Sequence, residues 1–442
     1  MGIVGMILAI VVMIVLAYKG FTAVPLTLIA SAIVIITNGL PIWSSYSGTF
    51  AGSFGNVMTG YFFIFVSSAV YAKLMELSGV ATAIAYKFID WFGTKRVMLV
   101  SALIVSVLTY GGISLFVVIF AVTPILFLLF KEANLPRHLI IAPYMMGATT
   151  YTMTCLPGSP QLTNVIPSQY LGTPLTAAPV FGIIMAILMF GCTYWYCLYA
   201  EKKARAKGEV WSYPDNYNKL AFEVDRSTLP SAGAAFAPII VLIAIIVAGS
   251  QLQSVIPMAK DSTLLTTVAM MVASILCCIL NWKRLGGAVV RDAAGTGAMN
   301  GITAIISLAA VVAFGSVVSS SPAFQTVIAW VIGVDMSPYF KSVFATAVVS
   351  GITGSSSAGL RICLENMAEY YIGSGGNLQI LHRLMAIASG SLDTLPHVSG
   401  IFLVLSSLGL THKTGYRHVF IVSVAIPAAL SILGALAISF IY

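Results

Sequence analysis

One apolar stretch of this chain is interrupted by Thr154-Cys155-Leu156-Pro157-Gly158-Ser159-Pro160. A second interruption, Asp393-Thr394-Leu395-Pro396-His397, carries its Leu-Pro pair 239 positions further on. Breaks at Gly112 and Gly351 are separated by the same 239 positions. The chain therefore contains one plan twice. Interrupted apolar segments at corresponding positions of two halves point to the binding site of a transporter.

The composition defines the class. Hydrophobic residues make up 59% of the 442 residues and charged residues only 8%, whereas a soluble domain carries roughly 25% charge. Apolar runs near the ~20 residues that cross a bilayer recur along the whole chain. The net charge of +8 is spread over short loops, which argues against nucleic acid as a partner. The sequence predicts an all-α polytopic membrane protein.

The interruptions divide the chain into two repeats of five crossings each. Since five is odd, the halves have opposite topology, and the repeat is inverted. The predicted divisions are a first repeat at 1–200 with a re-entrant hairpin at about 97–130 and a broken helix at about 138–170, a linker at 201–231, and a second repeat at 232–442 with a hairpin at about 338–372 and a broken helix at about 379–410. In the first repeat we also expect a helix near 57–76 that follows an uncharged external loop at 38–56.

Loop charge predicts the orientation, because basic residues concentrate on the cytoplasmic side. With the linker 201–231 in the cytoplasm, both termini lie outside. His138, His412 and His418 then fall in cytoplasmic loops, where we expect them to be solvated. His382 and Arg383 fall near the external end of a helix, where long polar side chains can reach the interface.

The four interruptions are expected to meet near the membrane midplane. Backbone that leaves helical geometry inside a bilayer must be buried in protein or line a wet cavity. Half-helix N-termini expose N–H groups and a partial positive charge, which suit a carboxylate. The candidate substrate-binding residues at or beside these breaks are Gly112, Ser114, Thr154, Gly158, Ser159, Gln161, Asn164, Ser355, Ser356, Ser357, Arg361, Thr394 and His397.

Ionisable residues at membrane depth are functional candidates. Arg361 could hold the substrate carboxylate as a fork or pair with Glu365 one helical turn on. Asp393 and His397 could carry a coupling proton. Alternatively, Asp393 caps the half-helix after the break, and His397 hydrogen-bonds nearby backbone.

Two stretches at the breaks carry a family resemblance. Residues 152–161 (TMTCLPGSPQ) with 164–167 (NVIP), and 390–397 (GSLDTLPH) with 409–413 (GLTHK), resemble the gluconate permease family, in a branch of hydroxybutyrate-type permeases. Residues 73–76 (KLME) followed by Ser78-Gly79 are similar to the same family. The resemblance implies a proton-coupled carboxylate symporter of a bacterial cytoplasmic membrane. The wider superfamily implies a homodimer and elevator-type movement.

The first break departs from the gluconate-transporting members, which carry a proline- and histidine-rich sequence there. We therefore expect a short hydroxy-monocarboxylate such as 3-hydroxybutyrate, with gluconate or another sugar acid as the alternative. Sodium coupling stays open, because hydroxyls and carbonyls at the breaks could bind Na⁺. An anion channel would also use polar breaks. No enzyme activity, metal or cofactor is expected, and the other partner is membrane lipid.

Overall fold

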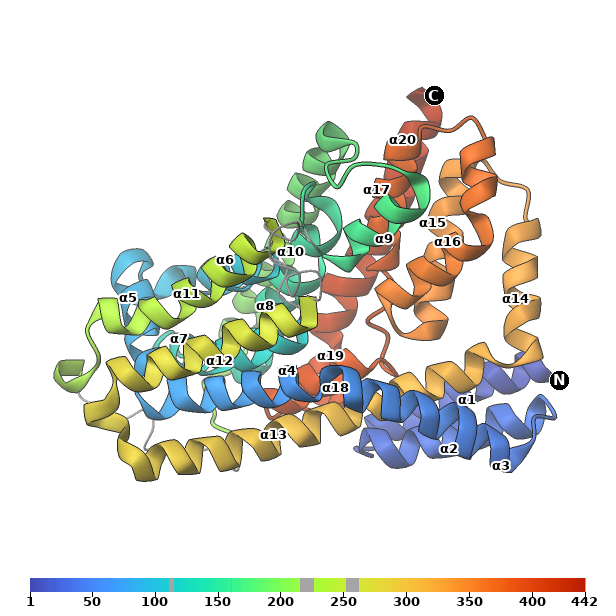
Figure 1. The fold of residues 1–442 in the computed structure, drawn as a ribbon. Coiled ribbons are helices and arrows are strands. Elements are labelled where there is room, and N and C mark those ends of the chain that lie inside the picture. The colour runs from blue at the N-terminus through green and yellow to red at the C-terminus, as the bar shows by residue number, and fades with distance from the viewer. Residues whose placement is uncertain (111–114, 160, 215–225, 252–261, 442) are drawn as a thin grey trace.

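The structure is a computed structural model that describes residues 1–110, 115–159, 161–214, 226–251 and 262–441 (Figure 1). These residues form helices and no strand. The elements of the first half are α1 (Gly2–Tyr18), α2 (Ala23–Thr37), α3 (Ile42–Ser44), η1 (Ser45–Phe50), α4 (Ala51–Leu77), α5 (Val80–Phe92), η2 (Thr94–Arg96), α6 (Val97–Tyr110), α7 (Leu115–Glu132), η3 (Arg137–Ile140), α8 (Ile141–Thr149), η4 (Tyr151–Cys155), α9 (Leu162–Leu171) and α10 (Pro179–Ala206).

The second half begins after the linker. Its elements are η6 (Arg226–Thr228), α11 (Ala232–Gln251), α12 (Ser262–Leu280), α13 (Trp282–Ser319), α14 (Pro322–Gly333), α15 (Pro338–Thr353), α16 (Ser356–Gly373), α17 (Leu378–Ser389), α18 (Ser399–Ser407), α19 (His412–Val419), η8 (Phe420–Ala425) and α20 (Ile426–Ile441).

Length and apolar composition make several of these helices able to cross a bilayer. Within the described ranges there are five such stretches, namely Ile42–Leu77, Pro179–Ala206, Thr263–Leu280, Trp282–Ser319 and His412–Phe440. A further span would result if α5 and the following Thr94–Tyr110, which are bent by 99°, counted as one. The predicted all-α membrane class is confirmed.

The predicted external loop at 38–56 is wrong for most of its length. Helix begins at Ile42 and runs through α3, η1 and α4 to Leu77 as one stretch of 36 residues. Residues 42–56 carry no charged side chain. The segment can therefore be helical in apolar surroundings without burying a charge. At about 1.5 Å per residue the stretch is roughly 54 Å long, which exceeds the ~30 Å hydrocarbon core. A helix of this length must tilt or protrude.

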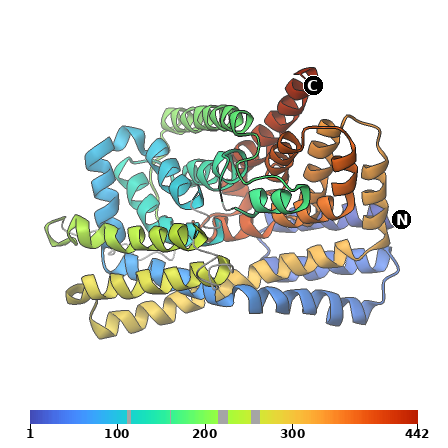
Figure 2. The same ribbon diagram turned by 45° about the horizontal axis from the view of Figure 1, so that its top comes forward.

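The long helices α4 and α13 lie alongside each other across one face of the molecule (Figures 1 and 2). Two glycines of α13 allow the backbones of α4 and α13 to touch. A Cβ at Gly297 would lie 2.6 Å from Cα of Val70, and a Cβ at Gly301 would lie 2.7 Å from the carbonyl oxygen of Phe65. Small residues let membrane helices approach in this way. Gly286, with φ +58°, kinks α13 near its start.

Packing pairs recur in the two halves. Helix α1 packs on α2 as α11 packs on α12. Helix α6 packs on α7 and α8, and α15 packs correspondingly on α16 and α17. The helix that precedes each break, α8 or α17, therefore packs on the hairpin of its own half, whereas the helix that follows it packs on the other half, α9 on α16 and α18 on α7.

The start of the linker is held against the body of the protein. Residues 207–214, here called the strap, follow α10. The backbone N–H of Trp211 donates to Oδ1 of Asn134 over 3.3 Å, and the indole packs edge-on against Phe127 at 5.7 Å between centroids. A Cβ at Gly409 would lie 2.9 Å from Cβ of Pro214. The strap therefore contacts both the α7–η3 turn and the α18–α19 turn.

Candidate functional site at the helix breaks

The second break separates α17 from α18. Residues 390–398 leave helical geometry between Ser389 and Ser399. Proline at 396 favours this, since it has no N–H to continue a helical ladder. Asp393 is 6% exposed and His397 is 2% exposed. Two ionisable side chains are thus held in non-helical backbone inside the protein.

The turn between α15 and α16, residues 354–355, lies against this break. Gly354 ends α15 with φ +63°, and Ser355 caps α16 by accepting from the N–H of Ala358 over 3.3 Å. A Cβ at Gly354 would lie 3.3 Å from Cγ2 of Val398. Left-handed backbone and close contact together require glycine here. This places the serines 355–357 next to the break.

Two side-chain contacts join the turn to the break. Nε2 of His397 donates to the carbonyl oxygen of Gly351 over 3.1 Å. The side chain of Ser356, in the first turn of α16, lies close enough to the Asp393 carboxyl to interact with it. The N-terminus of α16 therefore faces Asp393, and its partial positive charge favours an anion at this position.

Two polar atoms of the second break are buried without a protein partner. They are Oδ1 of Asp393 and Nδ1 of His397. Buried polar atoms in folded proteins are nearly always satisfied, and each exception calls for water, an ion or a ligand. The two atoms therefore mark the second break as a place where a polar molecule would be stabilised.

The first break is built in a corresponding way. Residues 151–155 form a π turn after α8, and the hydroxyl of Tyr110, at the end of α6, donates to the carbonyl oxygen of Pro157 over 3.1 Å. Nε2 of Gln161 donates to the carbonyl oxygen of Thr109 over 2.6 Å. The end of α6 thus contacts the first break, as the turn after α15 contacts the second.

The two breaks also meet each other. A Cβ at Gly390 would lie 2.8 Å from Cγ2 of Thr154. Ser423 in η8 joins both sides, because its Oγ lies 2.9 Å from Oγ1 of Thr149 and its carbonyl oxygen accepts from Oγ1 of Thr394 over 3.3 Å. Breaks that are 239 positions apart in sequence therefore form one buried polar region.

The candidate residues are distributed over this region as follows. Gly112 and Ser114 lie outside the described residues. Those at the second break or the turn beside it are Ser355, Ser356, Ser357, Asp393, Thr394 and His397, and those at the first break are Thr154, Gly158, Ser159, Gln161 and Asn164. Within the described part of the chain no three His, Cys, Asp or Glu side chains gather as metal ligands.

Arg361 differs from expectation. Its side chain is exposed on α16, and no ion pair with Glu365 forms. Glu365 instead accepts from the hydroxyl of Tyr170 over 3.2 Å. Of the two alternatives for Arg361, the i,i+4 pair with Glu365 does not form, and the exposed side chain does not join the buried region.

The prediction that His382 and Arg383 reach the interface is wrong. Both are 0% exposed. His382 bonds Oγ1 of Thr173 at 2.7 Å and Oδ1 of Asn164 at 2.9 Å. Asn164 also donates to the carbonyl oxygens of Ser159 and Leu175, both at 2.8 Å. His382 and Asn164 together hold α9 against α17.

The prediction that His412 and His418 are solvated is also wrong. His412 is 4% exposed and its Nε2 bonds the carbonyl oxygen of Pro396 at 2.8 Å. His418 is 9% exposed and its Nδ1 lies 3.0 Å from the hydroxyl of Tyr196. His138 is half-buried and stacks on His418 with ring centroids 5.3 Å apart. Hydrogen bonds to distant elements compensate for burying these rings.

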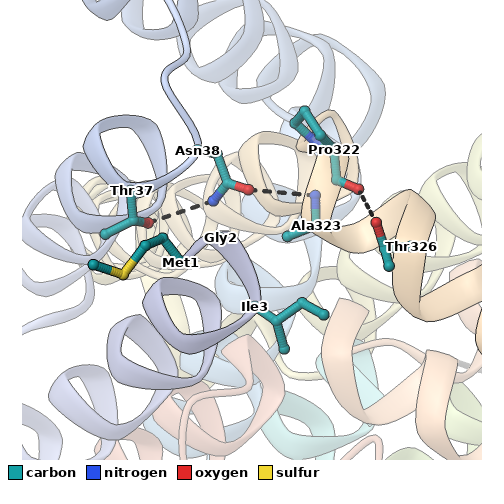
Figure 3. A pocket seen from close by; sticks show the side chains of 8 residues that line it. All are labelled: Met1, Gly2, Ile3, Thr37, Asn38, Pro322, Ala323 and Thr326. Carbon is teal, nitrogen blue, oxygen red and sulfur yellow. Dashed lines mark hydrogen bonds between the residues drawn. The ribbon is translucent and has the colours of Figure 1, made fainter.

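A separate pocket of about 390 Å³ lies far from the breaks in the fold (Figure 3). It is formed by the beginnings of α1 and α14 and the end of α2. The Asn38 amide crosses it, accepting from the N–H of Ala323 over 3.3 Å. The side chains lining it are uncharged.

Apolar crossing helices around a buried polar region define an integral membrane transporter. Residues 1–441 match the family described as GntP family permease, and the chain belongs to that family. It is 30% identical over 444 residues to "Uncharacterized transporter YxjC" of Bacillus subtilis (strain 168), covering 93% of this chain and 94% of the relative. The predicted family is confirmed, and the chain is a transporter rather than an enzyme.

Proposed function

We propose that the protein is a proton-coupled symporter of a small organic anion. The observation that carries this proposal is the buried, unpartnered Oδ1 of Asp393 in the same break as the unpartnered Nδ1 of His397. A carboxyl in that position can take up a proton without breaking a protein hydrogen bond at that oxygen. The adjacent N-terminus of α16 offers N–H groups to a substrate carboxylate.

In this proposal the substrate carboxylate lies between the two breaks. It is held by the serines 355–357 and by the polar groups of the first break, including Thr154 and Ser159. Asp393 carries the coupling proton, and His397 orients the turn beside it. Arg361 is left out because its side chain is exposed.

The proposed topology is an inverted repeat with one re-entrant hairpin in each half. The recurrence of packing pairs, α6 with α7 and α15 with α16, supports it. We place both termini outside the bacterial cytoplasmic membrane and the linker inside. Elevator-type movement would carry the region of the breaks past the α4–α13 pair.

The proposed substrate is a short hydroxy-monocarboxylate such as 3-hydroxybutyrate, with gluconate as the competing candidate. Labelled forms of both acids should be offered to proteoliposomes under imposed proton or sodium gradients. Accumulation of 3-hydroxybutyrate driven by an inward proton gradient supports the proposal. Uptake that only equilibrates under every gradient overturns the proposal. Accumulation driven by a sodium gradient alone would make sodium the coupling ion in place of the proton.

Asp393→Asn tests the residue assigned to coupling. This variant cannot release a proton, so we expect it to lose uphill uptake while still exchanging labelled for unlabelled substrate. Asp335→Asn is the matched control, because Asp335 is exposed in the turn between α14 and α15. Uphill uptake by Asp393→Asn equal to that of the control would remove Asp393 from the mechanism.

We also propose that the chain forms a homodimer. The mass of the purified protein in detergent, measured by light scattering with the detergent subtracted, tests this. A mass of one chain at all concentrations would overturn the proposal without bearing on the transport mechanism.

A further inference from the structure

The start of α19 is fixed by hydrogen bonds of the turn that precedes it. The backbone N–H of Thr414 donates to Oγ1 of Thr411 over 3.4 Å, and the N–H of Thr411 donates to Oγ1 of Thr414 over 3.0 Å. This reciprocal cap makes His412 the first residue of the helix. Nη2 of Arg137 donates to the carbonyl oxygen of Gly409 over 3.0 Å and holds the turn from outside. The stretch 409–413, which carries part of the family resemblance, therefore places His412 at a defined position.

Two side chains of α19 donate to the backbone of the second break. Nε2 of His412 donates to the carbonyl oxygen of Pro396 over 2.8 Å, and the hydroxyl of Tyr416 donates to the carbonyl oxygen of Thr394 over 3.1 Å. The hydroxyl of Thr394 donates in turn to the carbonyl oxygen of Ser423 in η8, which continues α19. The middle of the break is therefore held at three points by one neighbouring helical segment.

The geometry of these bonds requires a break. In an uninterrupted helix the carbonyl oxygens of Thr394 and Pro396 would accept from the N–H groups of Val398 and Gly400. They would also lie on opposite sides of that helix, because residues two apart are rotated by about 200° around its axis. The two donors are instead one turn apart on a single neighbouring helix. Both bonds can therefore form together only while the backbone of residues 394–396 is not helical.

The two donors are held in place by aromatic contacts. The imidazole of His412 lies 4.6 Å from the Phe402 ring and stacks on Tyr416 at 5.9 Å between centroids. Tyr18, at the end of α1, contacts both rings, at 5.9 and 6.2 Å. His412 and Tyr416 are each 4% exposed. Packing in this cluster restricts the rotamers of both side chains, which keeps each donor aimed at its carbonyl oxygen.

We propose that His412 and Tyr416 are positioning residues of the second break. Asp393 and His397 lie on either side of the stretch 394–396, whose carbonyl oxygens the two residues of α19 bind. Holding these peptides fixes the directions in which the side chains of Asp393 and His397 leave the backbone. The inference rests on the proposed function, in which Asp393 carries the coupling proton. His412 and Tyr416 act on that site through the backbone of the break and do not touch the substrate.

Single substitutions separate the hydrogen bonds from the packing. Tyr416→Phe removes only the hydroxyl that reaches Thr394. His412→Phe keeps a ring in the aromatic cluster but removes the donor, whereas His412→Gln loses the ring and keeps an N–H donor. Tyr18→Phe is the matched control, because it removes a phenolic hydroxyl from the same cluster at a side chain that is 43% exposed.

Two measurements should respond to loss of either bond. Hydrogen exchange of the peptide that covers residues 390–398 should become faster in Tyr416→Phe and His412→Phe, because the break loses a bond that fixes its backbone. The pH at which proton-driven uptake of 3-hydroxybutyrate is half-maximal should shift in the same two variants, because it depends on the surroundings of the coupling group. Gluconate replaces 3-hydroxybutyrate if it is the acid that the wild type accumulates. Tyr18→Phe should match the wild type, and His412→Gln should lie closer to the wild type than His412→Phe does.

A purely structural role would not move that pH. Loss of folded protein lowers uptake by the same factor at every pH and leaves the half-maximal pH unchanged. If Tyr416→Phe and His412→Phe show the pH profile of Tyr18→Phe, the inference is overturned, whatever their thermal stability. Unchanged hydrogen exchange at residues 390–398 in both variants would overturn it as well. If His412→Phe does not fold, Tyr416→Phe decides, since it removes a single hydroxyl.

Failure of the proposed function is a separate outcome. It would be seen in the wild type, as uptake of the acid that only equilibrates under a proton gradient. The hydrogen-exchange comparison needs no transport, so faster exchange in the two variants would still support a second break held by α19. A wild type that accumulates the acid, with variants that leave the half-maximal pH unchanged, would instead overturn only the role of His412 and Tyr416.

Discussion

His397 donates from Nε2 to the carbonyl oxygen of Gly351 over 3.1 Å, so a side chain of the second break holds the end of α15. The other ring nitrogen is buried without a partner. One histidine thus joins the α15–α16 turn to the candidate site. A ligand group that donates to Nδ1 would fix the tautomer that donates to Gly351.

His397→Ala should weaken substrate binding. It leaves the Gly351 carbonyl oxygen buried without a donor, which costs about 1–3 kcal/mol. That penalty lowers the free energy of unfolding, and we expect weaker substrate binding because the turn that carries the serines 355–357 is no longer held against the break. His397→Gln can still donate and should retain more affinity. Equal affinity in His397→Ala and wild type, measured by equilibrium binding, would contradict this role.

Gly354→Ala should disturb the turn after α15. A residue with a Cβ costs roughly 1–2 kcal/mol in left-handed backbone, and here the Cβ would also press on Val398 at 3.3 Å. Gly375→Ala is the control for strain alone, since Gly375 has φ +73° and open space around it. We expect Gly354→Ala to lose uptake while Gly375→Ala keeps it. Comparable uptake in the two variants would show that the contact with Val398 is unimportant.

Gly297→Ala should destabilise the α4–α13 pair. Its methyl group would lie 2.6 Å from Cα of Val70, and overpacking typically costs about 1–3 kcal/mol. Gly295→Ala is a control on the same helix with open space around it. Thermal unfolding in detergent should occur at a lower temperature for Gly297→Ala only. An unchanged midpoint temperature of unfolding would mean that α4 and α13 can move apart without destabilising the protein.

Trp211→Ala should release the strap. The indole packs on Phe127, and its loss removes one of the contacts that hold the strap, beside the Pro214 contact with Gly409 and the His138–Glu209 pair. Cleavage by trypsin after Lys207 should then become faster. Trp195→Ala removes an indole that is 68% exposed on α10 and should leave the cleavage rate unchanged. Identical rates in both variants would indicate that the strap is held by other contacts.

The interruptions at Pro157 and Pro396 have a local cause. Proline at 157 and at 396 removes a backbone donor wherever it occurs, so the interruptions could be located without the fold. The helix at 42–56 was missed for a related reason. Its serines, glycines and threonines resemble loop composition, and only the long packed pair of α4 and α13 shows why they are helical.

The surroundings of Arg383 could not be predicted. Its acceptors are carbonyl oxygens of Thr154, Leu175 and Ala177, and every residue has a carbonyl oxygen, so the sequence carries no sign of the pairing. The same holds for His412, whose acceptor is the carbonyl of Pro396. Basic residues near the expected end of a helix were therefore assigned to the interface although they are buried.

The glycines of α13 have a consequence for how this protein can move. Sliding α13 by one helical turn would place Ala293 against Val70 in one direction, or Ile305 against Phe65 in the other. Either side chain would collide with backbone that now touches Gly297 and Gly301. The pair is therefore locked in axial register and cannot ratchet. Any conformational change therefore leaves this pair in register and takes place at other surfaces of the protein.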